Sequence, residues 1–127
     1  MQATQAMGLG SPGVVPENLR AAVVDYLSTN ISRTDNHATI GIVSTSQLCP
    51  VLSDNGHHHL ALELISSISY SSYGYMFNNL YENATTLWQL FNAPSTGPGS
   101  SRNHIMYGSV RVWFYSHLAG ILILHSM

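Results

Sequence analysis

The chain has 127 residues, among them only 4 Lys or Arg and 6 Asp or Glu, and its formal net charge is −2. This length is typical of a single domain, and the lack of clustered cations excludes a surface built to bind nucleic-acid phosphates. Charged residues make up 8% of the chain, against about a quarter in an average soluble domain, which favours a piece of a larger buried assembly.

The N-terminal third predicts one amphipathic helix. Residues 1–13 have neither a basic region nor a long apolar run, so we do not expect a secretory signal. Pro16 suits the first position of a helix, and Glu17 then falls in its first turn. Residues 30–38 are polar and predict a loop. Spacings of three and four predict one buried face, formed by Leu19, Ala22, Val23, Tyr26 and Leu27.

The middle of the chain predicts a hairpin of two helices. The first runs from about Thr45 to Asp54, with Ser44 or Thr45 as its N-cap and Pro50 at a kink or in its first turn. The Ser-Asp-Asn-Gly sequence at 53–56 supplies the tight turn between them. The second helix is expected to bury a stripe of Leu60, Ala61, Leu64, Ile65 and Ile68.

The C-terminal part mixes aromatic residues with turn residues. Residues 70–81 show no clean periodicity, and 85–91 predict a short helix capped by Thr85 or Thr86. Residues 92–102 are rich in Pro, Gly and Ser and predict a surface loop. No segment predicts a strand, so the expected fold class is all-α. The clearest helix is the last, with a stripe of Val110, Trp113, Phe114, His117, Leu118 and Ile121.

The histidines and the single cysteine do not predict a metal site. Three consecutive histidines, 57–59, point about 100° apart on a helix and so cannot face one ion as an i, i+4 pair does. Cys49, His104 and His117 share no metal-ligand spacing. The most apolar run, 118–124, is far shorter than the about 20 residues that span a bilayer. We therefore expect no metal, no organic cofactor and no membrane partner.

Trp88, His104 and Trp113 allow two interpretations. Each of them alone is more often a core residue than a ligand. Together with Asn103 and Arg102 they also suit sugar binding, because aromatic faces stack on sugar C–H bonds while polar side chains bind hydroxyls. The residue types alone leave both interpretations open.

A series of short motifs in fixed order extends over nearly the whole chain up to Ile121. Upstream, the matching segments are 40–45, 50–56, 61–62 and 70–76; downstream they are 85–88, 97–99, 103–104, 108–110 and 119–121. In this order the chain resembles the C-terminal part of the catalytic domain of bacterial-type α-L-rhamnosidases. Those enzymes carry Thr-Thr-Leu-Trp-Glu, Gly-Pro-Gly, Asn-His, Gly-Ser-Val and Ala-Gly-Ile.

The resemblance implies a fold and a reaction. The family fold is an (α/α)6 barrel of helical hairpins, of which residues 1–121 would hold roughly the last two, with 122–127 as a divergent tail. The family hydrolyses terminal α-L-rhamnose with inversion, which needs one carboxylic acid and one carboxylate. The implied partner is a rhamnose-containing oligosaccharide or glycoside.

The family's catalytic carboxylates are the main departure. Its general base occupies the last position of Thr-Thr-Leu-Trp-Glu, which is Gln89 here. An amide cannot take a proton from water at neutral pH, so Gln89 would orient a water without acting as a base. The family's general acid lies upstream of the matched region. Glu82 and Glu63 fit no motif, and we do not expect either to substitute.

The resemblance also assigns the remaining sugar contacts. Trp88 would stack on the sugar, and His104 and Asn103 would bind hydroxyl groups. With one carboxylate absent and the other replaced by an amide, we expect this chain alone to be inactive. Two rival hypotheses are a non-catalytic carbohydrate-binding remnant and a decayed gene product without a stable fold.

Overall fold

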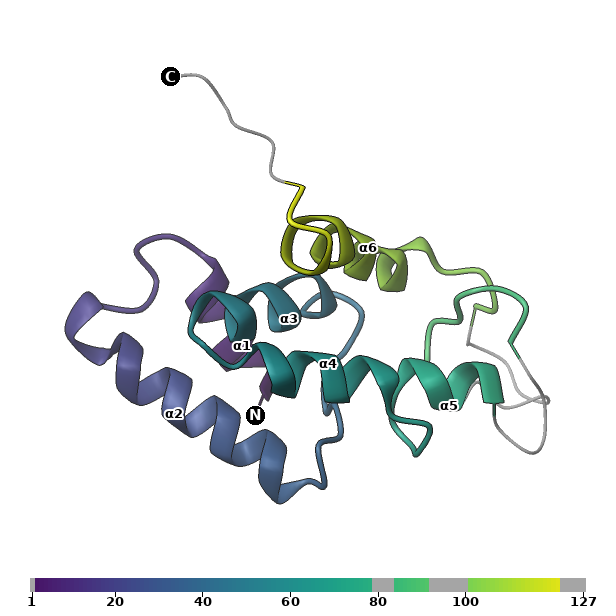
Figure 1. The fold of residues 1–127 in the computed structure, drawn as a ribbon, viewed down its shortest axis with the longest axis horizontal. Coiled ribbons are helices and arrows are strands. Elements are labelled where there is room, and N and C mark those ends of the chain that lie inside the picture. Colours follow the sequence, from purple (N-terminus) through teal and green to yellow (C-terminus); the bar gives the residue numbers. More distant parts are fainter. Residues whose placement is uncertain (1, 79–83, 92–100, 122–127) are drawn as a thin grey trace.

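The computed structural model describes residues 2–78, 84–91 and 101–121, and within these ranges it contains helices and no strand. Figure 1 shows α1 lying against both α2 and α3, with α4 beside α3. The predicted all-α class is therefore confirmed. The four N-terminal helices are α1 (Gln2–Gly10), α2 (Glu17–Arg33), α3 (Thr45–Asp54) and α4 (His58–Ser66).

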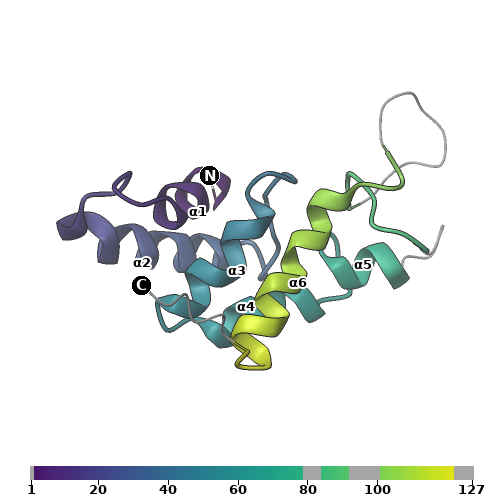
Figure 2. The same cartoon turned by 90° about the horizontal axis from the view of Figure 1, so that it is seen from above.

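The C-terminal part consists of shorter helical elements. Seen from above, residues 105–118 form one rod that lies beside α3, and the short helix over 73–78 lies at the far end of α4 (Figure 2). No helix in the described ranges is both long and apolar enough to cross a membrane. The elements are α5 (Tyr73–Asn78), the 3-10 helix η1 (Ile105–Ser109), α6 (Val110–Trp113) and η2 (Phe114–Leu118), a wider π-type turn.

The α3–α4 hairpin confirms its prediction. Helix α3 spans Thr45–Asp54 with Ser44 at the N-cap. Gly56 follows with φ of 84°, a left-handed conformation that glycine adopts without steric cost. The His57 amide donates to the Leu52 carbonyl at 2.8 Å and closes the end of α3. The Asn-Gly pair therefore sets the turn, as the sequence predicts.

Helix α2 begins where predicted, and Leu27 of the predicted stripe is buried while Val23 packs partly buried against the core, but the buried face as a whole is shifted. Its buried residues are Val24, Leu27 and Ile31, whereas Leu19 and Tyr26 are 49% and 62% exposed. The helix also continues to Arg33, into the segment predicted to be a loop. Helix α1 packs against α2, so the contact with α1 selects the buried face. Apolar spacing alone does not distinguish this face from its neighbour.

Helix α1 is not predicted by the sequence patterns, and a buried amide fixes it. Gln2 is fully buried. Its Nε2 donates to Thr34 Oγ1 at 3.2 Å and to the His37 carbonyl at 3.1 Å, and its Oε1 accepts from the Thr39 amide at 2.8 Å. These bonds hold α1 against the segment that follows α2. They join residues far apart in the chain, which local patterns cannot reveal.

Two predicted stripes are only partly buried. In α4, Leu64 is buried, but Ile68 lies beyond the helix end at Ser66 and is 72% exposed. In the last helix, Val110 and Trp113 are buried, whereas Phe114, Leu118 and Ile121 are 38%, 42% and 61% exposed. The chain widens into a π-type turn at 114–118. Because such a turn holds more residues, spacings of three and four no longer stay on one face.

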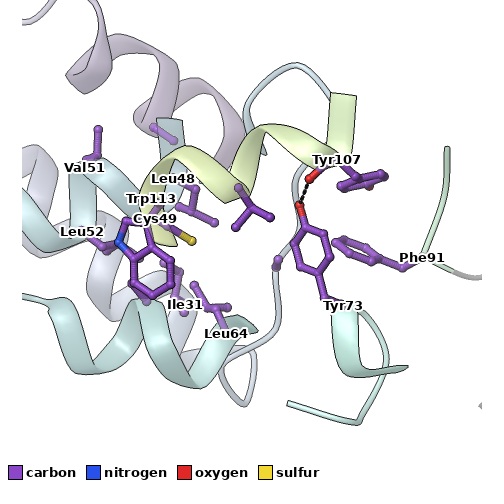
Figure 3. Packing of buried hydrophobic residues seen from close by; sticks show 14 of the residues in the cluster. Ile31, Leu48, Cys49, Val51, Leu52, Leu64, Tyr73, Phe91, Tyr107 and Trp113 are labelled. Carbon is purple, nitrogen blue, oxygen red and sulfur yellow. Dashed lines mark hydrogen bonds between the residues drawn. The ribbon is translucent and has the colours of Figure 1, made fainter. Parts of the chain in front are cut away.

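In the core, Trp113 lies among aliphatic residues, and the rings of Tyr73, Phe91 and Tyr107 form a separate group to one side of them (Figure 3). Trp113 is fully buried, and its Nε1 donates to Ser53 Oγ on α3 at 2.8 Å. Tyr73, Phe91 and Tyr107 pack with ring centroids 4.8–5.6 Å apart, and the Tyr73 hydroxyl donates to the Tyr107 carbonyl at 2.8 Å. This second group joins α5 and η1 to the segment around residue 91.

Burial of Cys49 predicts a loss of stability at alkaline pH. Burial raises the pKa of this thiol to about 12, whereas an unfolded cysteine has a pKa of about 8.5. The stabilising contribution is therefore complete below the unfolded pKa and is lost as the pH rises towards the folded value. Urea unfolding between neutral and alkaline pH, followed by circular dichroism, should show this decline. A Cys49→Ala variant should decline less steeply, and identical slopes for the two chains would refute the argument.

Candidate active-site wall

The segments 86–89 and 101–104 lie side by side and are joined by backbone hydrogen bonds. The His104 amide donates to the Leu87 carbonyl at 2.6 Å, and the Gln89 amide donates to the Ser101 carbonyl at 2.7 Å. The backbone of 85–91 thus bonds to the 101–104 segment in place of forming its own helical turns. The predicted helix over 85–91 is therefore wrong, because long-range pairing overrides local propensity. We call residues 86–89 and 101–104 the wall.

The register of the wall contains one extra residue. Leu87 and Gln89 are two positions apart, but their partners His104 and Ser101 are three apart. The two segments are not β-strands, but the count of two residues against three is the one found at a β-bulge, where the extra residue redirects a side chain. Arg102 and Asn103 lie between Ser101 and His104. The guanidinium carbon of Arg102 is 5.5 Å from the centre of the Trp88 ring.

Gln89 is held on both its main chain and its side chain by Ser101. Its amide N–H donates to the Ser101 carbonyl, and its Oε1 accepts from the Ser101 amide at 3.0 Å. Because a backbone N–H can bond only to an acceptor, this contact fixes which side-chain atom is the oxygen. Nε2 then carries two hydrogens that have no partner among the described residues. The Nε2 group of Gln89 can therefore donate hydrogen bonds to a molecule that lies next to the wall.

Trp88 lies in the core of this chain. It is 3% exposed, its amide faces Met76 Sδ at 3.4 Å, and Arg102 lies over its ring. The Arg102 guanidinium thus lies over a face of the indole on which a sugar could otherwise stack. Of the two interpretations that the sequence leaves open for Trp88, packing in the core describes its present surroundings.

His104 and Asn103 keep polar groups available. His104 Nδ1 accepts from the Met106 amide at 3.4 Å and caps η1, so a neutral ring carries its hydrogen on Nε2. Asn103 is exposed, and its main chain bonds to Ser101 Oγ. Each residue therefore presents side-chain groups that suit a sugar hydroxyl.

The two glutamates considered as substitutes differ in their placement. Glu63 lies on α4, where its Oε2 accepts from Asn36 Nδ2 at 2.9 Å and its Oε1 lies 3.3 Å from His59 Nδ1. Glu63 is thus engaged away from the wall. Glu82 lies outside the described residues, as do most of the predicted loop over 92–102 and the tail over 122–127. In the described ranges no three His, Cys, Asp or Glu side chains are grouped to hold a metal ion.

Ser101 is a wall residue for which the sequence patterns predict no role. Its hydroxyl donates to the Asn103 carbonyl at 3.1 Å and accepts from the Asn103 amide at 3.3 Å. A serine two residues before an asparagine is a pattern that favours such a local turn. This local signal indicates a turn, but it does not indicate the pairing with position 89.

Known proteins resemble the chain over almost all of its length. Residues 2–118 match the family model of the bacterial α-L-rhamnosidase six-hairpin glycosidase domain. An α-L-rhamnosidase from Streptomyces avermitilis is 35% identical over 117 residues, which cover 87% of this chain and 11% of that protein. One from Formosa agariphila is 34% identical over 101 residues, covering 75% of this chain and 11% of that protein.

Solved structures show the same similarity in three dimensions. The α-L-rhamnosidase of Dictyoglumus thermophilum has a TM-score of 0.81 at 35% identity, covering 91% of this chain and 13% of that one. The Streptomyces avermitilis enzyme complexed with L-rhamnose has a TM-score of 0.85 at 32% identity, covering 94% and 12%. The Aspergillus terreus enzyme shares the fold at 22% identity and a TM-score of 0.76, covering 91% and 14%.

The chain thus spans about 11% of the length of the curated relatives it matches. This share confirms the expectation that the chain corresponds to a small part of an α-L-rhamnosidase. As its ordered motifs predict, the chain belongs to the bacterial α-L-rhamnosidase six-hairpin glycosidase family.

Proposed function

We propose that this chain forms one wall of the sugar-binding cleft of a glycoside hydrolase that removes terminal α-L-rhamnose with inversion. Its substrate would be a rhamnose-containing oligosaccharide or glycoside. The observation that carries the proposal is the bonded pair of segments that sets Gln89, the family's base position, beside His104 and Asn103. The family match over residues 2–118 supports glycoside hydrolysis as the reaction.

The chemistry of inversion explains why the chain alone should be inactive. One carboxylic acid must protonate the leaving oxygen, and a carboxylate must activate a water on the other face of the sugar. Gln89 presents an amide at the second of these positions. Its Nε2 hydrogens can hold the oxygen of a water or a hydroxyl, but no atom of the amide accepts the water's proton at neutral pH.

The other wall residues have proposed roles in binding. The Nε2–H of His104 and the Asn103 amide would bind sugar hydroxyls, since these residues lie on the partly or fully exposed side of the wall. Trp88 would stack on the sugar once the Arg102 guanidinium moves off its ring. Such stacking uses the apolar C–H face of the sugar.

The isolated chain should not hydrolyse aryl α-L-rhamnosides. Loss of a general base commonly lowers a rate about 10²–10⁴-fold even when all other groups are present, and the family's acid position lies upstream of the matched residues. The measurement is release of the aryl alcohol compared with a no-enzyme control. Turnover above that control, abolished by Gln89→Ala, would show that position 89 catalyses by another route.

A non-catalytic carbohydrate-binding role is the second candidate, and the available Nε2 donors of Gln89 favour it. Titration of the isolated chain with L-rhamnose, followed by NMR, separates the two proposals. A dissociation constant in the micromolar range would support independent binding. One wall of a cleft should bind far more weakly, because the remaining contacts belong to other hairpins.

The packed core argues against the third candidate, a chain without a stable fold.

A further inference from the structure

The side chain at position 89 is held by a two-bond clamp, and both bonds come from Ser101. One joins the Gln89 amide to the Ser101 carbonyl at 2.7 Å, and the other joins the Ser101 amide to Gln89 Oε1 at 3.0 Å. The first bond fixes the backbone of residue 89. The second fixes the far end of its side chain, three rotatable bonds away. Position 89 thus has one defined orientation.

The Ser101 backbone is in turn held in place. Its hydroxyl bonds to the Asn103 amide at 3.3 Å and to the Asn103 carbonyl at 3.1 Å. On the following residue, the Thr86 hydroxyl donates to the Arg102 carbonyl. The His104 amide closes the far side of the bulge on Leu87. These bonds hold Ser101 and the residues that follow it against the 86–89 segment, and the Ser101 N–H points at Gln89 Oε1.

This clamp suits a carboxylate as well as it suits the amide. A glutamate at position 89 would have the same length and would present an oxygen where Gln89 has Oε1. That oxygen would accept from the Ser101 amide, leaving the second oxygen where Nε2 now lies. A hydrogen bond to the charged form favours ionisation. The carboxylate would then be ionised and oriented, with its second oxygen available to a water.

We infer that Ser101 is a positioning residue for the side chain at position 89, holding one of its oxygens through the main-chain N–H so that the other end faces the substrate. The inference rests on the proposed function for its catalytic meaning. It also explains how glutamine occupies this position without disturbing the wall, since Gln89 satisfies the same clamp.

NMR of the full chain carrying Gln89→Glu tests the inference without measuring activity. The Ser101 amide proton should move downfield as the introduced carboxyl ionises, with the same midpoint as that carboxyl. Arg102 and His104 are the charged or titratable groups on the paired segment. Adding His104→Gln removes the imidazole from this segment, so that a shift of the Ser101 proton in the double variant is due to the introduced carboxyl. A Ser101 proton that does not respond while the introduced carboxyl titrates would overturn the inference.

Variants at position 101 give a second readout in the Gln89→Glu background. Ser101→Pro removes the N–H and should raise the midpoint of the introduced carboxyl by about one pH unit, since two or three such bonds lower a carboxyl pKa by about 2 or more. Ser101→Thr keeps both the N–H and a hydroxyl and should leave the midpoint unchanged. Equal midpoints in a folded Ser101→Pro variant would contradict the role.

The positioning role and the proposed function can fail separately. If the Ser101 proton follows the introduced carboxyl but a complete barrel carrying Gln89→Glu stays inactive, the proposed function fails and the positioning role stands. If that barrel is active but the Ser101 proton ignores the titration, the positioning role fails and the proposed function stands.

Discussion

Gln89→Glu should raise the rate of rhamnoside hydrolysis by about 10²–10⁴-fold once the rest of the barrel is present. The rest can come from the Streptomyces avermitilis enzyme, in a chimera where the part of this chain that matches that enzyme replaces the corresponding stretch. Glutamine and glutamate are nearly the same size, and the Ser101 clamp accepts either. The gain would therefore come from a restored base and not from improved packing.

Two matched variants control this experiment. Glu63→Gln should leave the rate of the Gln89→Glu chimera unchanged, because Glu63 bonds to Asn36 and lies beside His59, away from the wall. His104→Ala should lower the rate through a lost hydroxyl contact. The rates are compared on one rhamnoside, with product anomers followed by NMR. Equal rates for the chimeras with and without Gln89→Glu, both with inversion, would place the base elsewhere.

Trp113→Ala should destabilise the isolated chain by about 3–5 kcal/mol, the usual cost of replacing a buried Trp or Phe with Ala. The indole is fully buried, packs 5.6 Å from the His58 ring and 5.5 Å from the Phe114 ring, and donates to Ser53 Oγ. Its loss removes apolar contacts between α3, α4 and α6. It also leaves Ser53 without this donor.

The control for Trp113 is its neighbour Val112, which lies on the same helix and is 61% exposed. Val112→Ala should change the free energy of unfolding by no more than about 0.5 kcal/mol, as surface substitutions usually do. Urea unfolding followed by circular dichroism measures both variants. Similar midpoints for Trp113→Ala and Val112→Ala would mean that the indole does not join the helices as the structure shows.

The parts of the fold that sequence patterns predict are those fixed by neighbouring residues. The end of α3 follows from the Asn-Gly turn, which acts within a few positions; Ser44 occupies the predicted N-cap position, but its hydroxyl donates to the Gly41 carbonyl and does not cap the helix. The start of α2 follows in the same way from Pro16 and Glu17. The turn residues Asn55-Gly56 and the helix-starting proline at 16 therefore predict helix bounds that the structure confirms.

The parts that the patterns miss depend on distant contacts. Helix α1 is held through Gln2 by residues more than 30 positions away, and the 86–89 segment pairs with 101–104 in place of forming a helix. Tyr26 and Leu19 have the spacing of a core stripe, yet both are exposed. Exposed apolar residues on several faces are typical of one part of a larger helical assembly.

The family motifs, more than local patterns, indicate the candidate wall. They assign Gln89, Trp88, His104 and Asn103 to positions that the structure brings into one pair of segments. They do not indicate that Trp88 is buried beneath Arg102, nor that Ser101 orients Gln89. Those features depend on a bulge in the pairing, which no local pattern specifies.

Calorimetric titration of the chimera with L-rhamnose tests the central proposal most directly, since it measures the cleft wall apart from the chemistry. A chimera that keeps Gln89 lacks the carboxylate base, but it retains the hydroxyl-binding groups of His104 and Asn103. We predict binding within about tenfold of the Streptomyces avermitilis parent, a difference of about 1.4 kcal/mol. We further predict that His104→Ala weakens it. A folded chimera that does not bind L-rhamnose would contradict the assignment of this chain to the wall of a rhamnose site.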